Sequence, residues 1–234
     1  MSIATEITRL QTAKADLKTA IEGKGVTVPS ATTLDGYAEL VGDIESGGGG
    51  SDTFADICNG TVTSYESTAL LRIPANVLRS ITTLTSFKAY NLQDINSYGL
   101  GGFRGTVIAL PGFTGSLYNG GYAFSGANTL KTVDIGDKVI RFYSGFFNGA
   151  SNLDTLIIRK STVPSLTNVN VFNNTKFQSS GTGGTLYVPS ALISSYESAT
   201  NWSTILGYEN NSIEAIEGSQ YENYYADGTP IPTT

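Results

Sequence analysis

The sequence predicts an α+β protein in which an N-terminal helical segment is tethered to a β-rich repeat solenoid with a C-terminal cap. Three observations lead to this fold class: apolar residues at 3-4 spacing over residues 3–22, a glycine-rich run at 46–51, and a motif that recurs after 23 residues. A fixed period between about 20 and 50 residues indicates units that bury their apolar faces against their neighbours.

The repeat is clearest between Ala123 and Arg159, where AFSGANTLKTVDI (123–135) is followed by FFNGASNLDTLII (146–158). Apolar residues at offsets 0, 3 and 5 of each copy are the predicted core positions, and the last two alternate as the inner face of a short strand does. These positions are Leu130, Val133, Ile135, Leu153, Leu156 and Ile158. One phenylalanine per unit is expected to form a continuous core row: Phe103, Phe124, Phe147 and Phe172. In the preceding, weaker unit, the residues expected to replace the Leu-Val-Ile core positions are Val107, Ala109, Pro111 and Phe113.

The 3-4 spacing predicts a helix over residues 3–22, and a second helix is expected from Ser30 or Thr33 through Ile44. Their apolar residues form the expected oligomerisation and attachment seam: Ile3, Ile7, Leu10, Leu17, Ile21, Leu34, Tyr37, Val41 and Ile44. Short helices are marginal alone and this pair has little core, which favours oligomerisation or docking on a larger body. A self-contained helical hairpin is the open alternative.

These patterns divide the chain into a helical segment (1–45), a glycine-rich linker (46–52), a repeat domain (53–217) and a polar tail (218–234) that lies on the surface or on a partner. Short strands between Thr53 and Ile73 are expected to begin the repeat domain. A strand over 184–189, a helix from Pro189 or Ser190, and an edge strand near Ile213 are expected to end it. Without a cap the last repeat would expose its core. The residues expected to cover it are Leu192, Tyr196 and Trp202.

Composition excludes several functions. A net charge of −6 argues against nucleic-acid binding, and no apolar run approaches the ~20 residues of a membrane span. The chain has no histidine and one cysteine, Cys58, which is expected to be a buried, unreactive thiol. No catalytic, cofactor-binding or metal-binding residue is predicted. Asp134, Asp137 and Asp154 are interpreted as solvated structural residues and not as glycosidase carboxylates.

The tyrosines of the Gly-Tyr-rich turns are candidate receptor contacts: Tyr98, Tyr118 and Tyr122. Their rings offer an aromatic surface for sugars, and the alternative is that they pack on the flank of the solenoid.

Two resemblances extend this interpretation. The repeat units, together with the ending Leu186-Tyr187-Val188-Pro189 and Thr200-Asn201-Trp202-Ser203, resemble the BspA-type leucine-rich repeat over residues 105–217 or so. That resemblance implies a recognition solenoid without catalysis, although the first units and the long last unit depart from the pattern. Residues 3–44 are similar to the N-terminal segment of many phage tail and fibre proteins. This second resemblance implies a virion attachment module.

Together they lead us to expect a structural, non-enzymatic phage virion protein, a head or tail fibre or a decoration protein, exposed on the particle surface. It is expected to form a homotrimer, to attach through its N-terminal segment to capsid, portal or tail and baseplate proteins, and to contact a host-surface glycan or protein. No cofactor, nucleic acid or membrane insertion is expected. A bacterial cell-surface adhesin is the alternative, and it predicts a secretion signal or wall anchor, which is not visible here.

Overall fold

The computed structural model describes residues 3–22, 28, 54–115 and 121–231. The chain divides into two compact units, Met1–Ser51 and Asp52–Thr234, and the division falls at the end of the glycine-rich run. In the first unit, helix α1 spans Ile3–Glu22, as the apolar spacing predicts. The expected second helix, with Leu34, Tyr37, Val41 and Ile44, lies outside the described residues. No described helix is long and apolar enough to cross a membrane.

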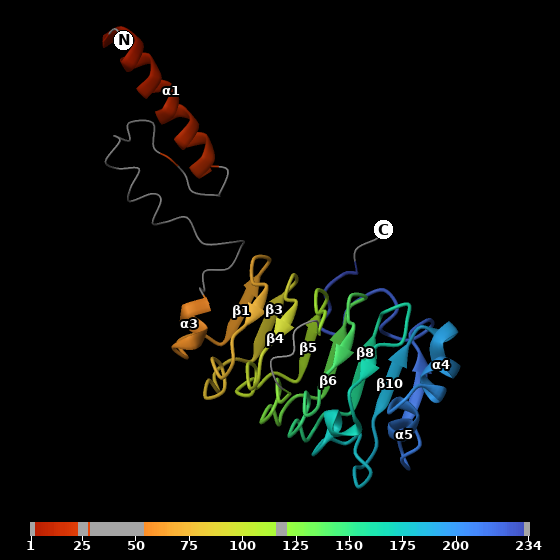
Figure 1. The fold of residues 1–234 in the computed structure, drawn as a ribbon. Coiled ribbons are helices and arrows are strands. Elements are labelled where there is room, and N and C mark those ends of the chain that lie inside the picture. The colour runs from red at the N-terminus through yellow and green to blue at the C-terminus, as the bar shows by residue number, and fades with distance from the viewer. Residues whose placement is uncertain (1–2, 23–27, 29–53, 116–120, 232–234) are drawn as a thin grey trace. The chain divides into compact units, whose positions relative to one another are not determined.

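The second unit is organised around parallel strands that stack in chain order (Figure 1). Its five-stranded sheet has the order β11-β10-β8-β6-β5, and β1 pairs in parallel with β3. The bounds are β1 Ser64–Ser67, β3 Ser86–Ala89, β5 Val107–Leu110, β6 Thr132–Ile135, β8 Thr155–Ile158, β10 Thr185–Val188 and β11 Ser212–Ala215. Thr132 of β6 pairs with Thr155 of β8, so the register of this pair equals the 23-residue period of the sequence.

Shorter strands that come after β1, β3, β6 and β8 in the chain form a second row of parallel pairs. It comprises β2 (Arg72–Ile73) with β4 (Asp94–Ile95), and β7 (Arg141–Phe142) with β9 (Ser165–Leu166). Backbone hydrogen bonds also join the turns of adjacent units, as from the N–H of Tyr98 to the carbonyl of Tyr122 at 2.9 Å. Each unit therefore satisfies its backbone groups largely against the next unit along the stack.

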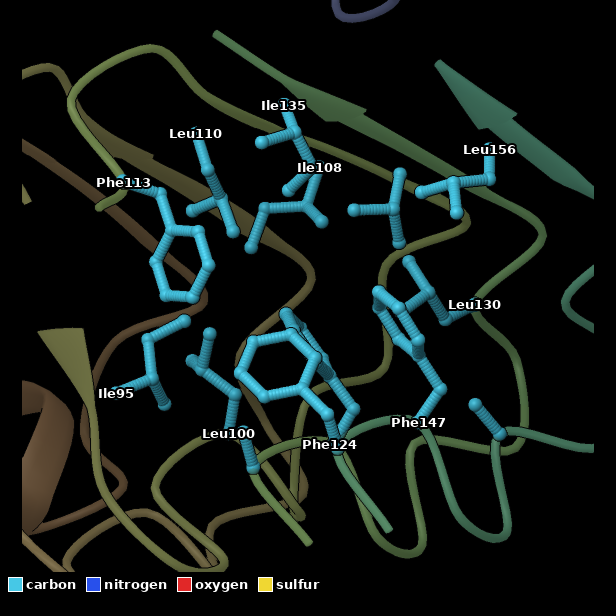
Figure 2. Packing of buried hydrophobic residues seen from close by; sticks show 14 of the residues in the cluster. Ile95, Leu100, Ile108, Leu110, Phe113, Phe124, Leu130, Ile135, Phe147 and Leu156 are labelled. Carbon is cyan, nitrogen blue, oxygen red and sulfur yellow. The ribbon is translucent and has the colours of Figure 1, made fainter. Parts of the chain in front are cut away.

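The core lies between these rows. All six predicted positions, Leu130, Val133, Ile135, Leu153, Leu156 and Ile158, are fully buried. The ring of Phe147 stacks on that of Phe124 at 5.7 Å (Figure 2). It also stacks on Phe172 at 5.5 Å, and these contacts confirm this part of the predicted phenylalanine row. Phe103 is buried too.

The predicted register of β5 is wrong by one residue. Ile108 pairs with Val133 and Leu110 with Ile135, and both point into the core, whereas Val107 pairs with Thr132. A one-residue shift moves every side chain of a strand to the other face. The interval from β5 to β6 is 25 residues and not 23, so the period alone would shift the pairing by two residues and keep the same face. The wrong face was assigned because Val107 and Ala109 are apolar as well as Ile108 and Leu110. Phe113 is buried as predicted.

The start of the repeat domain also differs from expectation, because Phe54–Cys58 forms helix α3 and not a strand. Phe54, Ile57 and Cys58 follow helical spacing, and Ile57 is completely buried. The Cys58 thiol is half-buried, and this burial raises its pKa, which disfavours the reactive thiolate.

The helix and the edge strand that the sequence predicts after β10 are both present. After β10 come the 3₁₀ helix η2 (Ser190–Leu192), the helices α4 (Ile193–Ser198) and α5 (Trp202–Leu206), and then the edge strand β11. Trp202 is buried beside Tyr196, and its indole N–H donates to the carbonyl of Pro164 at 2.7 Å. A further 3₁₀ helix, η1 (Val169–Phe172), lies within the long last unit.

Candidate functional site

Two of the three predicted receptor tyrosines lie together. The rings of Tyr98 and Tyr122 stack at 5.5 Å with 7° between their planes, and the guanidinium of Arg79 lies 4.2 Å from the Tyr98 ring. Tyr122 is 39% exposed, whereas Tyr98 is half-buried. Tyr118 lies outside the described residues. The tyrosine column (Arg79, Tyr98 and Tyr122) thus combines packing on the flank with one exposed ring.

Backbone conformation places these rings in line. Tyr98, Tyr122 and Gly145 all have positive φ, at 58°, 75° and 75°. A Cβ at Gly145 would lie 3.0 Å from the Tyr122 ring, so the missing side chain gives this ring its space. A left-handed backbone conformation costs a residue with a Cβ about 1 kcal/mol. The contact of the Arg79 guanidinium with the Tyr98 ring contributes a stabilisation of similar size, about 1 kcal/mol.

The N-terminal seam is visible on α1. Ile7, Leu10 and Leu17 are 52%, 44% and 38% exposed, whereas Ile21 is buried. Ile3 begins the same helix. These exposed residues belong to the 3-4 series from which the sequence predicts an oligomerisation surface. The seam residues after Ile21 lie outside the described part of the chain.

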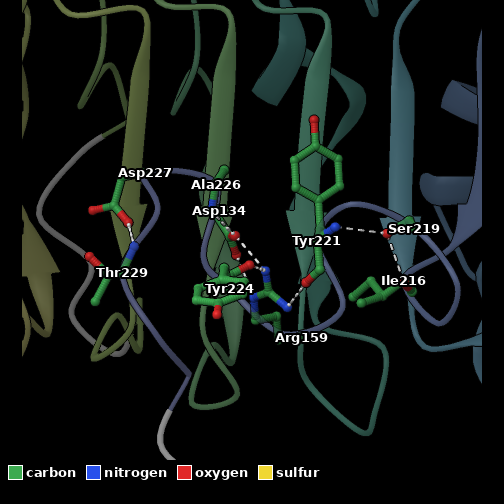
Figure 3. A network of polar contacts seen from close by, with 9 residues as sticks. All are labelled: Asp134, Arg159, Ile216, Ser219, Tyr221, Tyr224, Ala226, Asp227 and Thr229. Atoms are coloured by element: carbon green, nitrogen blue, oxygen red, sulfur yellow. Dashed lines mark hydrogen bonds and ion pairs between the residues drawn. The ribbon is translucent and has the colours of Figure 1, made fainter.

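A cluster of polar side chains on the sheet binds residues 218–231, which we call the C-terminal strap. The sequence predicts a tail here, and the structure places it across the outer face of the repeat domain's own sheet (Figure 3). Arg159 donates hydrogen bonds to the carbonyls of Tyr221 and Tyr224, each at 2.8 Å. The N–H of Ala226 donates to Oδ2 of Asp134 at 2.8 Å.

The strap is shaped by a tight turn at Asp227-Gly228. The N–H of Tyr225 donates to the carbonyl of Thr229 at 2.8 Å, and the N–H of Thr229 donates to the Asp227 carboxylate at 2.9 Å. Gly228 has a φ of 82°, which glycine adopts readily. An Asp-Gly pair is a strong turn signal in the sequence, but it does not reveal where the turn docks.

At the centre of the strap site is a buried ion pair between Asp134 of β6 and Arg159, which directly follows β8. Nε of Arg159 lies 2.8 Å from Oδ1 of Asp134, and its terminal nitrogen lies 2.7 Å from Oδ2. The Asp134 side chain is fully buried and that of Arg159 is 9% exposed. Burial raises the pKa of the Asp134 carboxyl from its ordinary value of 3.8 to about 6, while hydrogen bonds from Arg159 and Ala226 act in the opposite direction.

The interpretation of Asp134 as a solvated residue is therefore wrong, because the strap covers it. The other two acidic residues of that set remain at the surface: Asp154 pairs with Lys176 at 2.7 Å, and Asp137 is exposed. Sequence reasoning also missed Arg159. Two signals were available in the sequence. Asp134 occupies a position where the next repeat has Ile157, and an arginine, Arg159, directly follows β8.

The strap borders two hollows. The smaller, of about 300 Å³, lies over β5 and β6 and is lined by Val107, Thr132, Tyr221 and Tyr224. The larger, of about 730 Å³, lies where β3, β5, β6 and β8 end, and Tyr90, Pro111, Asp137, Lys138 and Tyr225 line it. Within the described residues, no group of three or more cysteine, aspartate or glutamate side chains is arranged to hold a metal ion.

No family model matches this chain, and the comparisons with curated proteins and with solved structures give no match either.

Proposed function

We propose that this protein is a structural, non-enzymatic component of a phage virion, a head or tail fibre or a decoration protein. Its repeat domain would be a BspA-type leucine-rich-repeat solenoid displayed toward the host surface, and its N-terminal segment would attach it to the particle. The observation that carries the proposal is the row of exposed apolar side chains on α1, in a chain whose repeat domain buries its own core completely.

The α1 seam supports self-association. Exposed Ile7, Leu10 and Leu17 would leave apolar area in water in a single chain. A second and third copy of the same helix would present the same 3-4 series and cover it, at about 25 cal/mol for each Å² removed from water. We propose a homotrimer that docks on capsid, portal or tail and baseplate proteins.

The repeat domain supports recognition. Its parallel units repeat the same outward positions along the stack, which offers a long surface with little change of backbone. The tyrosine column and the hollows beside the strap provide aromatic and polar contacts on that surface. Three copies on one fibre would let weak contacts with a host glycan or protein add up.

The test compares the mass in solution of the full chain with that of residues 46–234, by light scattering. The full chain should have three times the mass of one subunit, and the shortened chain the mass of one. Leu10→Glu with Leu17→Glu should also dissociate the full chain, because charges would enter the seam. Thr12→Glu, at an exposed polar position of the same helix, is the matched control.

The second arm asks where the protein resides, by mass spectrometry of purified phage particles and of bacterial envelopes. Detection in particles supports the proposal. A full chain that is monomeric and does not co-sediment with particles contradicts it, and detection in a bacterial envelope instead would favour the adhesin.

A further inference from the structure

The larger hollow is a cleft built from consecutive units. Tyr90 and Asn91 follow β3, Pro111 follows β5, and Asp137 follows β6. The strap supplies the facing residues, including Tyr225 and Ile231. The carboxyl ends of successive parallel strands therefore meet one closing segment around about 730 Å³, which is within the usual size of a small-molecule site.

We propose that this cleft binds a short neutral saccharide. The choice of a glycan as the ligand rests on the proposed function in host recognition. The location of the binding site and the absence of a net charge on the ligand are inferred from the cleft itself. The site is separate from the tyrosine column, whose members do not line it.

The aromatic residues of the cleft are held in place before any ligand arrives. The Tyr90 hydroxyl donates to Oε1 of Glu66 at 2.8 Å. The Tyr225 side chain is buried, and its ring lies 4.9 Å from the Arg159 guanidinium. Ring faces carry negative charge density and attract the weakly positive C–H groups of a pyranose face. Rings that are already fixed lose little conformational entropy on binding.

The charges of the cleft favour a neutral ligand. The positive charge of Arg159 is neutralised by its ion pair with Asp134, so it does not favour an anionic ligand. The other charged side chains in the lining of the cleft are Asp137 and Lys138, which are exposed and carry opposite signs. The Asn91 amide donates to the carbonyl of Thr68 at 2.7 Å, and its oxygen is an additional acceptor. A saccharide hydroxyl both donates and accepts, and therefore suits this mixture without requiring a net charge.

The test titrates the full chain with maltotriose, mannotriose and triacetylchitotriose as neutral probes, and with 3′-sialyllactose as an acidic one, by calorimetry. At least one neutral trisaccharide should bind with a Kd below about 5 mM, a level that weak single-site recognition reaches. Tyr90→Ala and Asp137→Asn should each weaken that binding at least tenfold. Glu209→Gln changes an exposed carboxylate outside the cleft in the same way and should leave the binding unchanged.

Each other outcome overturns the proposal. It is wrong if no neutral trisaccharide binds to folded full chain, if only 3′-sialyllactose binds, or if Glu209→Gln abolishes binding while the two cleft variants retain it. Asp137→Asn changes an exposed side chain and keeps the test valid even where Tyr90→Ala fails to fold. Failure here is distinguishable from failure of the proposed function, because a trimeric, particle-bound protein without saccharide binding refutes the cleft alone.

Discussion

The carboxylate of Asp134 on β6 and the guanidinium of Arg159 after β8 form a bidentate ion pair that also holds the C-terminal strap. Arg159 donates onward to Tyr221 and Tyr224, and Asp134 accepts from the N–H of Ala226. Hydrogen bonds from two repeat units thus converge on one segment that follows in the chain some 60 residues or more later. The pair is buried because the strap lies over it.

Replacing Arg159 by alanine should release the strap and destabilise the repeat domain. The change leaves the Asp134 carboxylate buried without its cation, and breaking a buried pair in this way typically costs about 3–5 kcal/mol. Chymotrypsin cleavage beside Tyr221 and Tyr224 should become faster, and the free energy of unfolding should fall by an amount in that range.

Arg141→Ala is the control for this experiment, because Arg141 is exposed on β7. If Arg159→Ala and Arg141→Ala lose the same stability and resist chymotrypsin equally, the ion pair does not hold the strap.

The pKa of Asp134 predicts a pH dependence of stability. Its folded value of about 6 lies above its ordinary value of 3.8, so the folded state binds this proton more tightly than the unfolded state. The contribution of this carboxyl to stability is therefore greatest below pH 4 and declines as the pH rises through about 6. The decline amounts to about 3 kcal/mol at most, because a difference of one in pKa corresponds to about 1.4 kcal/mol.

Urea unfolding of the wild type and of Asp134→Asn between pH 4 and 7 isolates this effect. Other carboxyls, such as Glu217, whose pKa hydrogen bonds lower, titrate in both proteins and cancel in the difference. The stability of the wild type relative to the variant should fall with rising pH. A difference that stays constant or grows would show that the pKa of Asp134 is not raised.

Phe147→Ala should be the most damaging of the single phenylalanine truncations along the stack. Phe147 is fully buried, stacks on both Phe124 and Phe172, and contacts Phe146 edge-on at 4.8 Å. Removing a buried phenylalanine side chain costs about 3–5 kcal/mol. Thermal unfolding provides the measurement, and Tyr122→Ala at the exposed ring should cost less than half as much. Equal losses would contradict the role of Phe147 in the core row.

Gly136→Ala should destabilise the contact between the β5 and β6 units. An added Cβ at this position would lie 2.1 Å from the backbone carbonyl oxygen of Pro111, a distance that requires one unit to move from the other. Overpacking of this kind costs about 1–3 kcal/mol, and a backbone neighbour places it at the upper end. Gly207→Ala, where the nearest heavy atom would lie at 3.1 Å, should change stability by less than half as much. Equal effects in chemical unfolding would contradict the close approach.

Local patterns predicted much of the repeat domain. The core positions of β6 and β8 and the helix α1 follow from spacing alone, because each pattern repeats the geometry of one element. The helix after β10 was predicted from its start signal at Pro189 or Ser190. The pairing of β5 could not be predicted from the period, since the interval from β5 to β6 is two residues longer than the period. Its inward face was misassigned because apolar residues occupy both faces of this strand. The helix α3 was missed because its five residues are too few for a period to be distinguished from a strand.

By itself the sequence determined which residues face the core of the strong repeats, since neighbouring units of the same length must place equal positions above one another. Only the tertiary structure decided that the strap returns over the sheet, that Asp134 becomes buried, and that a cleft forms at the strand ends. Those features depend on contacts between residues about 60 to 90 positions apart, such as Arg159 with Tyr221 and Asp134 with Ala226. A local periodic pattern in the sequence cannot predict contacts over such distances.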